Sequence, residues 1–142
     1  VRVYMSNTDS VATSTFPIKN GVPVYAGTTA IDRVPRPAAR VQLAFVNIAG
    51  GSCGAMLPTG STVDQIDGVA ATMIDNGMPV VVMQSTDLGI TGAESPVQLD
   101  RNDALRARLE SIRLQAGHLM GLGDVTEATI PKLTIVPVLT IY

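Results

Sequence analysis

A glycine-rich stretch near the middle of the chain, residues 50–61, constrains the fold most because it separates two regions with β-strand patterns. It contains four of the thirteen glycines and the only cysteine, Cys53. Glycine accepts positive φ angles and allows another backbone or a ligand to come close. Successive N–H groups in such a loop can bind an anion. A plain connection between two sheets fits the pattern equally well.

The region before this stretch predicts several strands. Residues 1–5 alternate between apolar and polar positions, and residues 11–16 are rich in β-branched side chains. Asn20-Gly21 is a strong hairpin signal leading into residues 22–25. Residues 41–48 are apolar on both alternating faces after Gln42, which predicts a strand buried on both sides.

The region after the stretch predicts two strands, one helix and a last strand. Residues 69–74 and 80–84 flank a turn at Asn76-Gly77, and residues 133–141 are strongly apolar. A helix is expected at about residues 102–120, with Asp100 or Asn102 as its N-cap. Its apolar residues form one stripe, which predicts an outer helix lying on a sheet. The fold class is therefore β-rich α+β.

Composition narrows the possible functions. Charged residues make up 15% of the 142 residues, against about a quarter in typical domains, so part of the apolar surface should be covered from outside this chain. The net charge of −2 argues against nucleic-acid binding. The single cysteine excludes an internal disulfide and a cysteine-based zinc site, and the single histidine excludes a metal motif with two histidines.

The ends of the sequence and its apolar runs indicate where in the cell the protein is expected. No targeting signal or membrane-length apolar run is visible, so we expect a cytoplasmic protein without membrane contact. Both ends fall within strand patterns, which suggests a piece of a longer protein whose remainder packs against it.

Three side chains could carry chemistry, and each has a plainer interpretation. Cys53 cannot open a long helix because Pro58 follows too soon, so a packing role is favoured over a reactive thiol. His118 is placed to cap the end of the helix rather than to act as a base. Lys132 precedes an apolar strand and could equally bind a carboxylate or lie at a strand edge.

Taken in order, the motifs resemble the PrpF family from about residue 1 to residue 135. They are Gly54-Ala55-Met56-Leu57-Pro58-Thr59-Gly60, Ile74-Asp75-Asn76-Gly77-Met78-Pro79-Val80-Val81, Asp87-Leu88-Gly89-Ile90-Thr91-Gly92, Arg108-Leu109-Glu110-Ser111-Ile112-Arg113-Leu114 with Met120-Gly121-Leu122, and Pro131-Lys132-Leu133. Because these separated motifs keep the family's order, the resemblance is specific.

The resemblance implies a diaminopimelate-epimerase-like fold, in which two β-rich domains each wrap a sheet around a central helix. Residues 1–50 would be later strands of the first domain, and residues 51–68 the glycine-rich crossover loop. Residues 69–142 would form the first half of the second domain. The fold would thus be partial.

The resemblance also implies the chemistry: a cofactor-independent isomerase or tautomerase that moves a proton on a small unsaturated di- or tricarboxylate. Keto–enol tautomerisation of 4-oxalomesaconate in gallate degradation is the leading expectation. Methylitaconate or 2-methylaconitate isomerisation, or a non-enzymatic β-rich binding module, are the alternatives. No metal or cofactor is implied, a homo-oligomer stays open, and the fragment alone should be inactive.

The family's catalytic cysteine lies in an Asn-Cys-Gly-Asn-type motif that would precede Val1, so no catalytic residue is expected here. The resemblance places the glycine loop and the hairpin turn on opposite lips of the substrate cleft. The substrate-binding residues carried over are Ser52, Cys53, Gly54, Thr59, Gly60, Asn76, Gly77, Met78 and Lys132, with Asn7 and Thr8 less firmly supported.

Overall fold

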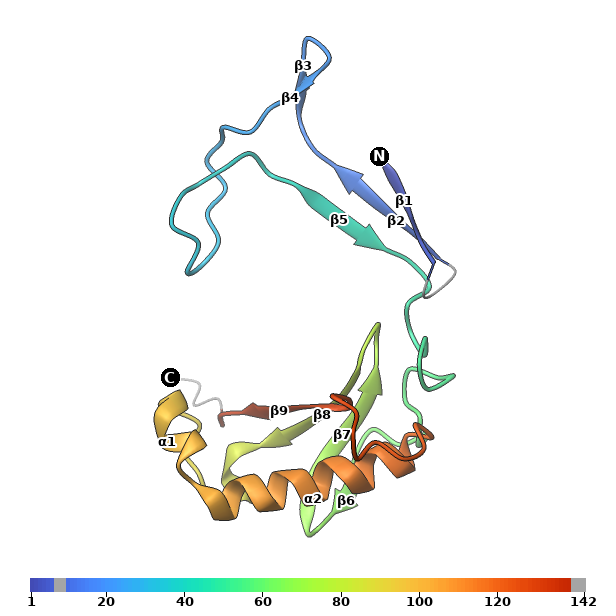
Figure 1. The fold of residues 1–142 in the computed structure, drawn as a ribbon, viewed down its shortest axis with the longest axis vertical. Coiled ribbons are helices and arrows are strands. Elements are labelled where there is room, and N and C mark those ends of the chain that lie inside the picture. The colour runs from blue at the N-terminus through green and yellow to red at the C-terminus, as the bar shows by residue number, and fades with distance from the viewer. Residues whose placement is uncertain (7–9, 139–142) are drawn as a thin grey trace. The chain divides into compact units, whose positions relative to one another are not determined.

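The structure is a computed structural model that describes residues 1–6 and 10–138 (Figure 1). The chain divides into two compact units, Val1–Ile48 and Ala49–Tyr142, called unit 1 and unit 2 below. Two of the expected substrate-binding residues, Asn7 and Thr8, lie outside the described residues.

Unit 1 contains a three-stranded antiparallel sheet and a small hairpin. The sheet has the order β1-β2-β5, formed by Arg2–Met5, Ser10–Thr15 and Gln42–Phe45. The hairpin pairs β3 (Ile18–Lys19) with β4 (Val22–Pro23). Its two turn residues, Asn20 and Gly21, have φ angles of 53° and 77°, the positive values that a type I′ turn requires. The predicted strands and hairpin are confirmed.

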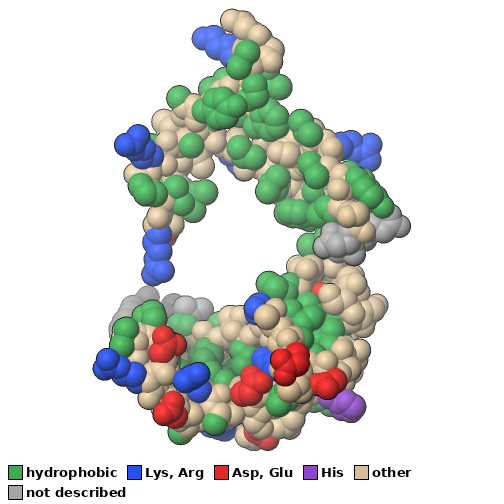
Figure 2. Space-filling view, in the orientation of Figure 1, with side chains coloured by type: hydrophobic (Ala, Val, Ile, Leu, Met, Phe, Trp, Pro, Cys, Tyr) green, Lys and Arg blue, Asp and Glu red, His purple; other side chains and the backbone are tan. Residues whose placement is uncertain are grey.

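The prediction that residues 41–48 are buried on both faces is wrong. All four residues of β5 are exposed, and Leu43 and Phe45 keep 57% and 49% of their surface accessible. Figure 2 shows hydrophobic side chains gathered over the surface of unit 1. The described part of unit 1 contains no helix that could cover this sheet. An apolar pattern therefore predicted the strand but not its burial.

Unit 2 is built on a four-stranded sheet with the order β6-β7-β8-β9. Its strands are β6 (Asp64–Ile66), β7 (Val69–Asp75), β8 (Pro79–Gln84) and β9 (Lys132–Val136). The first three pair antiparallel, whereas β8 and β9 are parallel. No strand was predicted for β6, which lies within the stretch interpreted as crossover loop.

Three helical segments connect β8 to β9: η1 (Ser85–Leu88), α1 (Pro96–Asp100) and α2 (Asp103–Leu119). Asn102 caps α2 by accepting a hydrogen bond from the Leu105 N–H at 3.0 Å, as one of the two predicted caps. At the other end Gly121, with φ of 73°, donates to His118 O at 3.0 Å, while Leu122 N–H bonds to Gly117 O at 2.9 Å. These two bonds form a Schellman motif.

The core of unit 2 lies between α2 and one face of the sheet. Alternate residues of β7 and β8 are buried, which matches the period of two expected for strands. They pack with Leu105, Leu109, Ile112 and Ala116 of α2, so the predicted apolar stripe is confirmed at these positions. Leu119, the last residue of the predicted stripe, is 48% exposed and lies outside the cluster. The buried cluster comprises Ile66, Val69, Ala71, Met73, Val81, Met83, Leu88, Leu105, Ile112, Ala116 and Met120.

An arginine organises the connection from α2 to β9. The Arg113 guanidinium donates to the carbonyl oxygens of Val125, Ala128 and Ile130 at 2.9, 3.0 and 3.1 Å. Glu110, one helical turn earlier, accepts from Arg113 at both carboxylate oxygens, at 2.7 and 2.8 Å. This connection ends directly before Lys132, so Arg113 fixes the approach to β9.

Candidate functional site

Asp75, the last residue of β7, holds the start of the glycine loop. Its side chain is fully buried, with 0% exposure. Its Oδ2 atom accepts hydrogen bonds from the backbone N–H groups of Ser52 and Cys53, at 2.7 and 2.8 Å. Consecutive N–H groups converging on one carboxylate oxygen form an anion-binding nest, and the anion in it belongs to the protein.

The other donors expected from the loop are also engaged within the protein. The Gly54 N–H bonds to Gly50 O at 2.8 Å, and the Gly60 N–H bonds to Leu57 O at 2.9 Å. The Thr59 hydroxyl donates to Asp64 Oδ2 at 2.7 Å. A substrate carboxylate would have to displace these partners.

The glycine loop and the hairpin turn lie next to each other. Ala49 forms an isolated β-bridge with Asn76, and the Gly50 N–H donates to Asp75 O at 2.8 Å. The Asp75 N–H donates to Met56 O at 2.9 Å. The prediction of two opposite lips is therefore wrong for these two segments, because backbone hydrogen bonds join them on one side.

The hairpin turn itself is open to solvent. Asn76, Gly77 and Met78 connect β7 to β8 and are all exposed, with 47% of the Met78 surface accessible. Gly77 has a φ of 93°, which favours glycine there. The turn offers an amide side chain, backbone N–H groups and one apolar contact.

Lys132 lies at the same end of the sheet as this turn. It is the first residue of β9 and pairs with Val80 near the start of β8. Parallel strands begin at the same sheet edge, so the lysine backbone is close to the turn. Leu133 packs on the core, which directs Lys132 to the opposite face of the sheet. The Lys132 side chain is exposed, and its ammonium group has no hydrogen bond or ion pair among the described residues.

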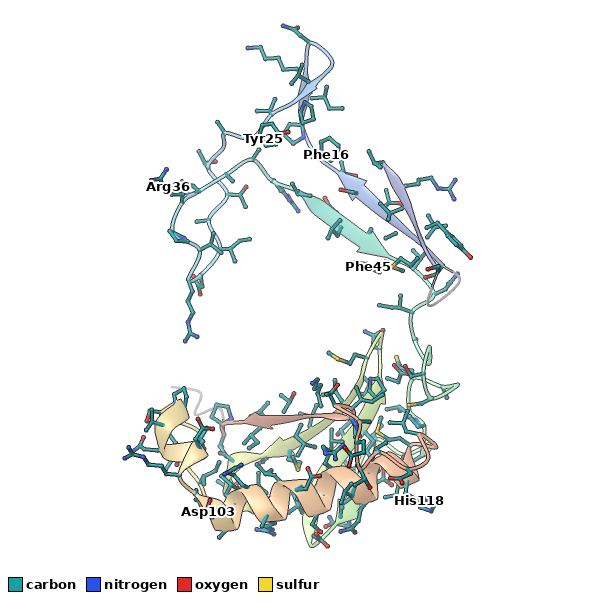
Figure 3. The ribbon with its side chains drawn as sticks, viewed as in Figure 1. Phe16, Tyr25, Arg36, Phe45, Asp103 and His118 are labelled. Carbon is teal, nitrogen blue, oxygen red and sulfur yellow. The ribbon has the colours of Figure 1, made fainter. Side chains whose placement is uncertain are left out.

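The structure also describes Cys53 and His118. Cys53 packs against the core cluster. Burial first, and then the neighbouring Asp75 carboxylate, raises the pKa of its thiol to about 11. A thiol that stays protonated at neutral pH is a poor nucleophile, which supports the packing interpretation. His118 lies exposed in the last turn of α2 (Figure 3).

The sequence pattern did not single out Asp75, because this residue directly precedes the predicted turn at Asn76-Gly77. A signal existed, since Asp75 shares its alternating face with the core residues Ala71 and Met73. A carboxylate on a buried face needs hydrogen-bond donors, so this position indicates a partner elsewhere in the chain.

Neither a metal-binding cluster nor a membrane-spanning helix occurs among the described residues. They contain no group of three metal-ligating side chains. None of their helices combines the length and the apolar character needed to cross a bilayer.

The chain is similar to known proteins of one family. The family model described as "PrpF protein" matches residues 1–142. The chain belongs to the PrpF family. It is 49% identical over 136 residues to "(4E)-oxalomesaconate Delta-isomerase" of Novosphingobium sp. (strain KA1), covering 96% of this chain and 38% of the relative. It is 48% identical over 135 residues to "4-oxalomesaconate tautomerase" of Pseudomonas putida, covering 95% and 37%.

A solved structure shows the same fold. The crystal structure of methylitaconate-delta-isomerase matches with a TM-score of 0.85 and 25% identity, over 94% of this chain and 37% of that chain. The predicted partial PrpF fold is therefore confirmed. The chain spans 37–38% of the length of the two curated relatives described above.

Proposed function

We propose that the polypeptide containing this chain is a cofactor-independent isomerase of small unsaturated di- or tricarboxylates. The leading reaction is keto–enol tautomerisation of 4-oxalomesaconate, in the breakdown of aromatic compounds. The observation that carries the proposal is identity of 48–49% to two proteins with oxalomesaconate in their names, over nearly the whole chain.

The reaction requires removal of a proton from carbon next to a carbonyl group. The electron pair of the broken C–H bond moves into the adjacent C–C bond, and the carbonyl oxygen becomes an enolate oxygen that takes up a proton. A base, an acid and donors that hold the developing negative charge are needed. The described residues supply candidates for the donors only.

The role proposed for this chain is binding of a substrate carboxylate by Lys132 and by the turn formed by Asn76, Gly77 and Met78. The Lys132 ammonium group is exposed and unpaired among the described residues, and the residue lies at the end of the sheet where the turn is. An ammonium group without a partner suits a carboxylate, and backbone N–H groups add directional hydrogen bonds. The residues of the glycine loop remain proposed contacts of lower rank, because their donors are engaged elsewhere.

The test is Lys132→Met in the complete polypeptide. A charge-assisted hydrogen bond of about 1.5–3 kcal/mol corresponds to a KM increase of about tenfold to a hundredfold. Loss of ground-state binding raises KM and leaves kcat nearly unchanged. Lys19→Met, at the other lysine, is the matched control, because Lys19 is exposed in the β3–β4 hairpin. An unchanged KM in Lys132→Met would remove this lysine from the site.

Substrate comparison decides the reaction. The complete polypeptide should convert 4-oxalomesaconate with a higher kcat/KM than methylitaconate or 2-methylaconitate. A preference for methylitaconate would favour the alternative suggested by the matching crystal structure. The chain of 142 residues alone should be inactive, and a complete polypeptide without activity on any of the three would favour a non-enzymatic binding module.

A further inference from the structure

One buried carboxylate connects the two segments of the candidate site. Asp75 has no side-chain exposure, and no cationic side chain pairs with it among the described residues. Its Oδ1 atom is buried and has no hydrogen-bond partner there. Burial of a carboxylate without a cation and with one unbonded oxygen costs folding free energy. The bonds from Asp75 to the glycine loop therefore need an explanation beyond simple packing.

Four hydrogen bonds join Asp75 to the glycine loop. Side-chain Oδ2 accepts from Ser52 and Cys53 at 2.7 and 2.8 Å. The backbone of the same residue accepts from Gly50 at 2.8 Å and donates to Met56 at 2.9 Å. Residues 50–56 are thus tied at four points to the residue that directly precedes the hairpin turn.

The loop has few other means of keeping this position. Within residues 50–56, Cys53 is the one side chain that packs on the core cluster. Gly50 has a φ of 74°, and a Cβ atom there would lie 2.6 Å from the Ala55 nitrogen. The loop is therefore tightly folded on itself, and Asp75 determines where it attaches.

We propose that Asp75 is the positioning residue of the candidate site. Its carboxylate fills the nest of the glycine loop and holds that loop and the turn at Asn76, Gly77 and Met78 as one unit. The turn then keeps a single geometry toward the substrate carboxylate. This inference rests on the proposed function for its kinetic consequence, but its structural consequence is independent of it.

The test is Asp75→Asn in the complete polypeptide, followed by amide hydrogen exchange in NMR spectra. The neutral amide is a weaker acceptor of about the same size. The Ser52 and Cys53 amides should exchange at least about tenfold faster, and the Met73 amide in the core should not change. The Gly77 and Met78 amide signals should shift. Asp67→Asn, at the exposed turn between β6 and β7, is the matched control.

The kinetic readout separates positioning from stability. KM for the carboxylate substrate should rise about tenfold to a hundredfold, because a small displacement of a binding group can cost that much. The kcat value should change little. Suppose that the complete polypeptide has no isomerase activity but that the Ser52 and Cys53 amides exchange faster in the Asp75→Asn variant. This result would support the positioning of the loop by Asp75 and would contradict only the proposed function.

Two outcomes would overturn the inference. One is unchanged exchange at Ser52 and Cys53 in the Asp75→Asn variant. If that variant does not fold, amide exchange in the unsubstituted protein tests the inference instead. Its Ser52 and Cys53 amides should exchange at least about tenfold more slowly than the Gly51 amide, which has no partner among the described residues. Equal rates for these three amides are the other overturning outcome.

Discussion

Units 1 and 2 have similar sequence patterns and different interiors. The described part of unit 2 has eleven buried residues in one apolar cluster, between α2 and the sheet. In the described part of unit 1, Ala12 is the one buried hydrophobic residue. Large apolar side chains such as Tyr4, Ile18 and Phe45 stay exposed there.

The difference shows that alternation and burial are separate properties. Alternating apolar residues specify a strand with one apolar face, but only a second layer removes that face from water. In unit 2 the second layer is α2, which lies within the chain. We expect the layer for unit 1 to come from the remainder of the polypeptide, as the low share of charged residues suggested.

Matched leucine substitutions test this comparison with the largest expected effect. Leu105 in α2 is 5% exposed, and Leu43 in β5 is 57% exposed. Leu105→Ala should lower the free energy of unfolding of this chain by about 2–5 kcal/mol, because it leaves a cavity. Leu43→Ala should change it by at most about 0.5 kcal/mol, as at ordinary surface sites. Urea unfolding monitored by circular dichroism measures both.

The same two variants test whether unit 1 has a buried interior. Equal losses in the 142-residue chain would show that unit 1 has an interior of its own. In the complete polypeptide, a Leu43→Ala loss that grows toward about 2 kcal/mol would show that β5 becomes covered there.

Arginine substitutions give the next largest effect. The Arg113 side chain is 13% exposed and serves the carbonyl oxygens of Val125, Ala128 and Ile130. Lysine lacks the planar set of donors, so Arg113→Lys should cost about 1–3 kcal/mol of unfolding free energy. Arg36→Lys in unit 1 is the control (Figure 3), since Arg36 is exposed and forms no hydrogen bond among the described residues. Similar values for both in thermal unfolding would contradict the assigned role of Arg113.

Much of the fold follows from local signals, and much of the site does not. The Asn20-Gly21 turn, the strands around Asn76-Gly77 and the stripe of α2 depend on neighbours within a few residues, so they were predictable. The three-residue strand β6 forms because β7 pairs with it, and its own sequence is too short to indicate this.

The contacts of Asp75 show why the arrangement of the site could not be predicted from the sequence. Its partners Ser52 and Cys53 lie 23 and 22 residues earlier in the chain. Spacing patterns carry no information on such pairs. The glycine loop could be interpreted as an anion-binding loop or as a plain connection, and nothing in its sequence indicates an internal anion. Lys132 could be singled out as a lone cation, but its place beside the turn became visible only from the parallel pairing of β8 and β9.

The smallest expected effect concerns Glu94, a half-buried residue whose carboxylate organises a loop in unit 2. Glu94 accepts from the Thr91 N–H at 2.7 Å and from the Gly92 N–H at 2.8 Å. These hydrogen bonds, with the Thr91 backbone first, lower the pKa of Glu94 from 4.5 to about 2. A lowered folded-state pKa means that the stabilisation is complete above pH 4.5 and is lost as pH falls toward 2.

Glu94→Gln should therefore be less stable than the unsubstituted chain at neutral pH. The difference in unfolding free energy should shrink below about pH 4.5 and disappear near pH 2, as measured by urea unfolding at each pH. Asp32→Asn removes the same charge from unit 1, where this carboxylate accepts no hydrogen bond among the described residues. If the two variants gave the same pH profile, net charge rather than loop bonding would explain the effect. The contrast between the units would then be confined to their apolar residues.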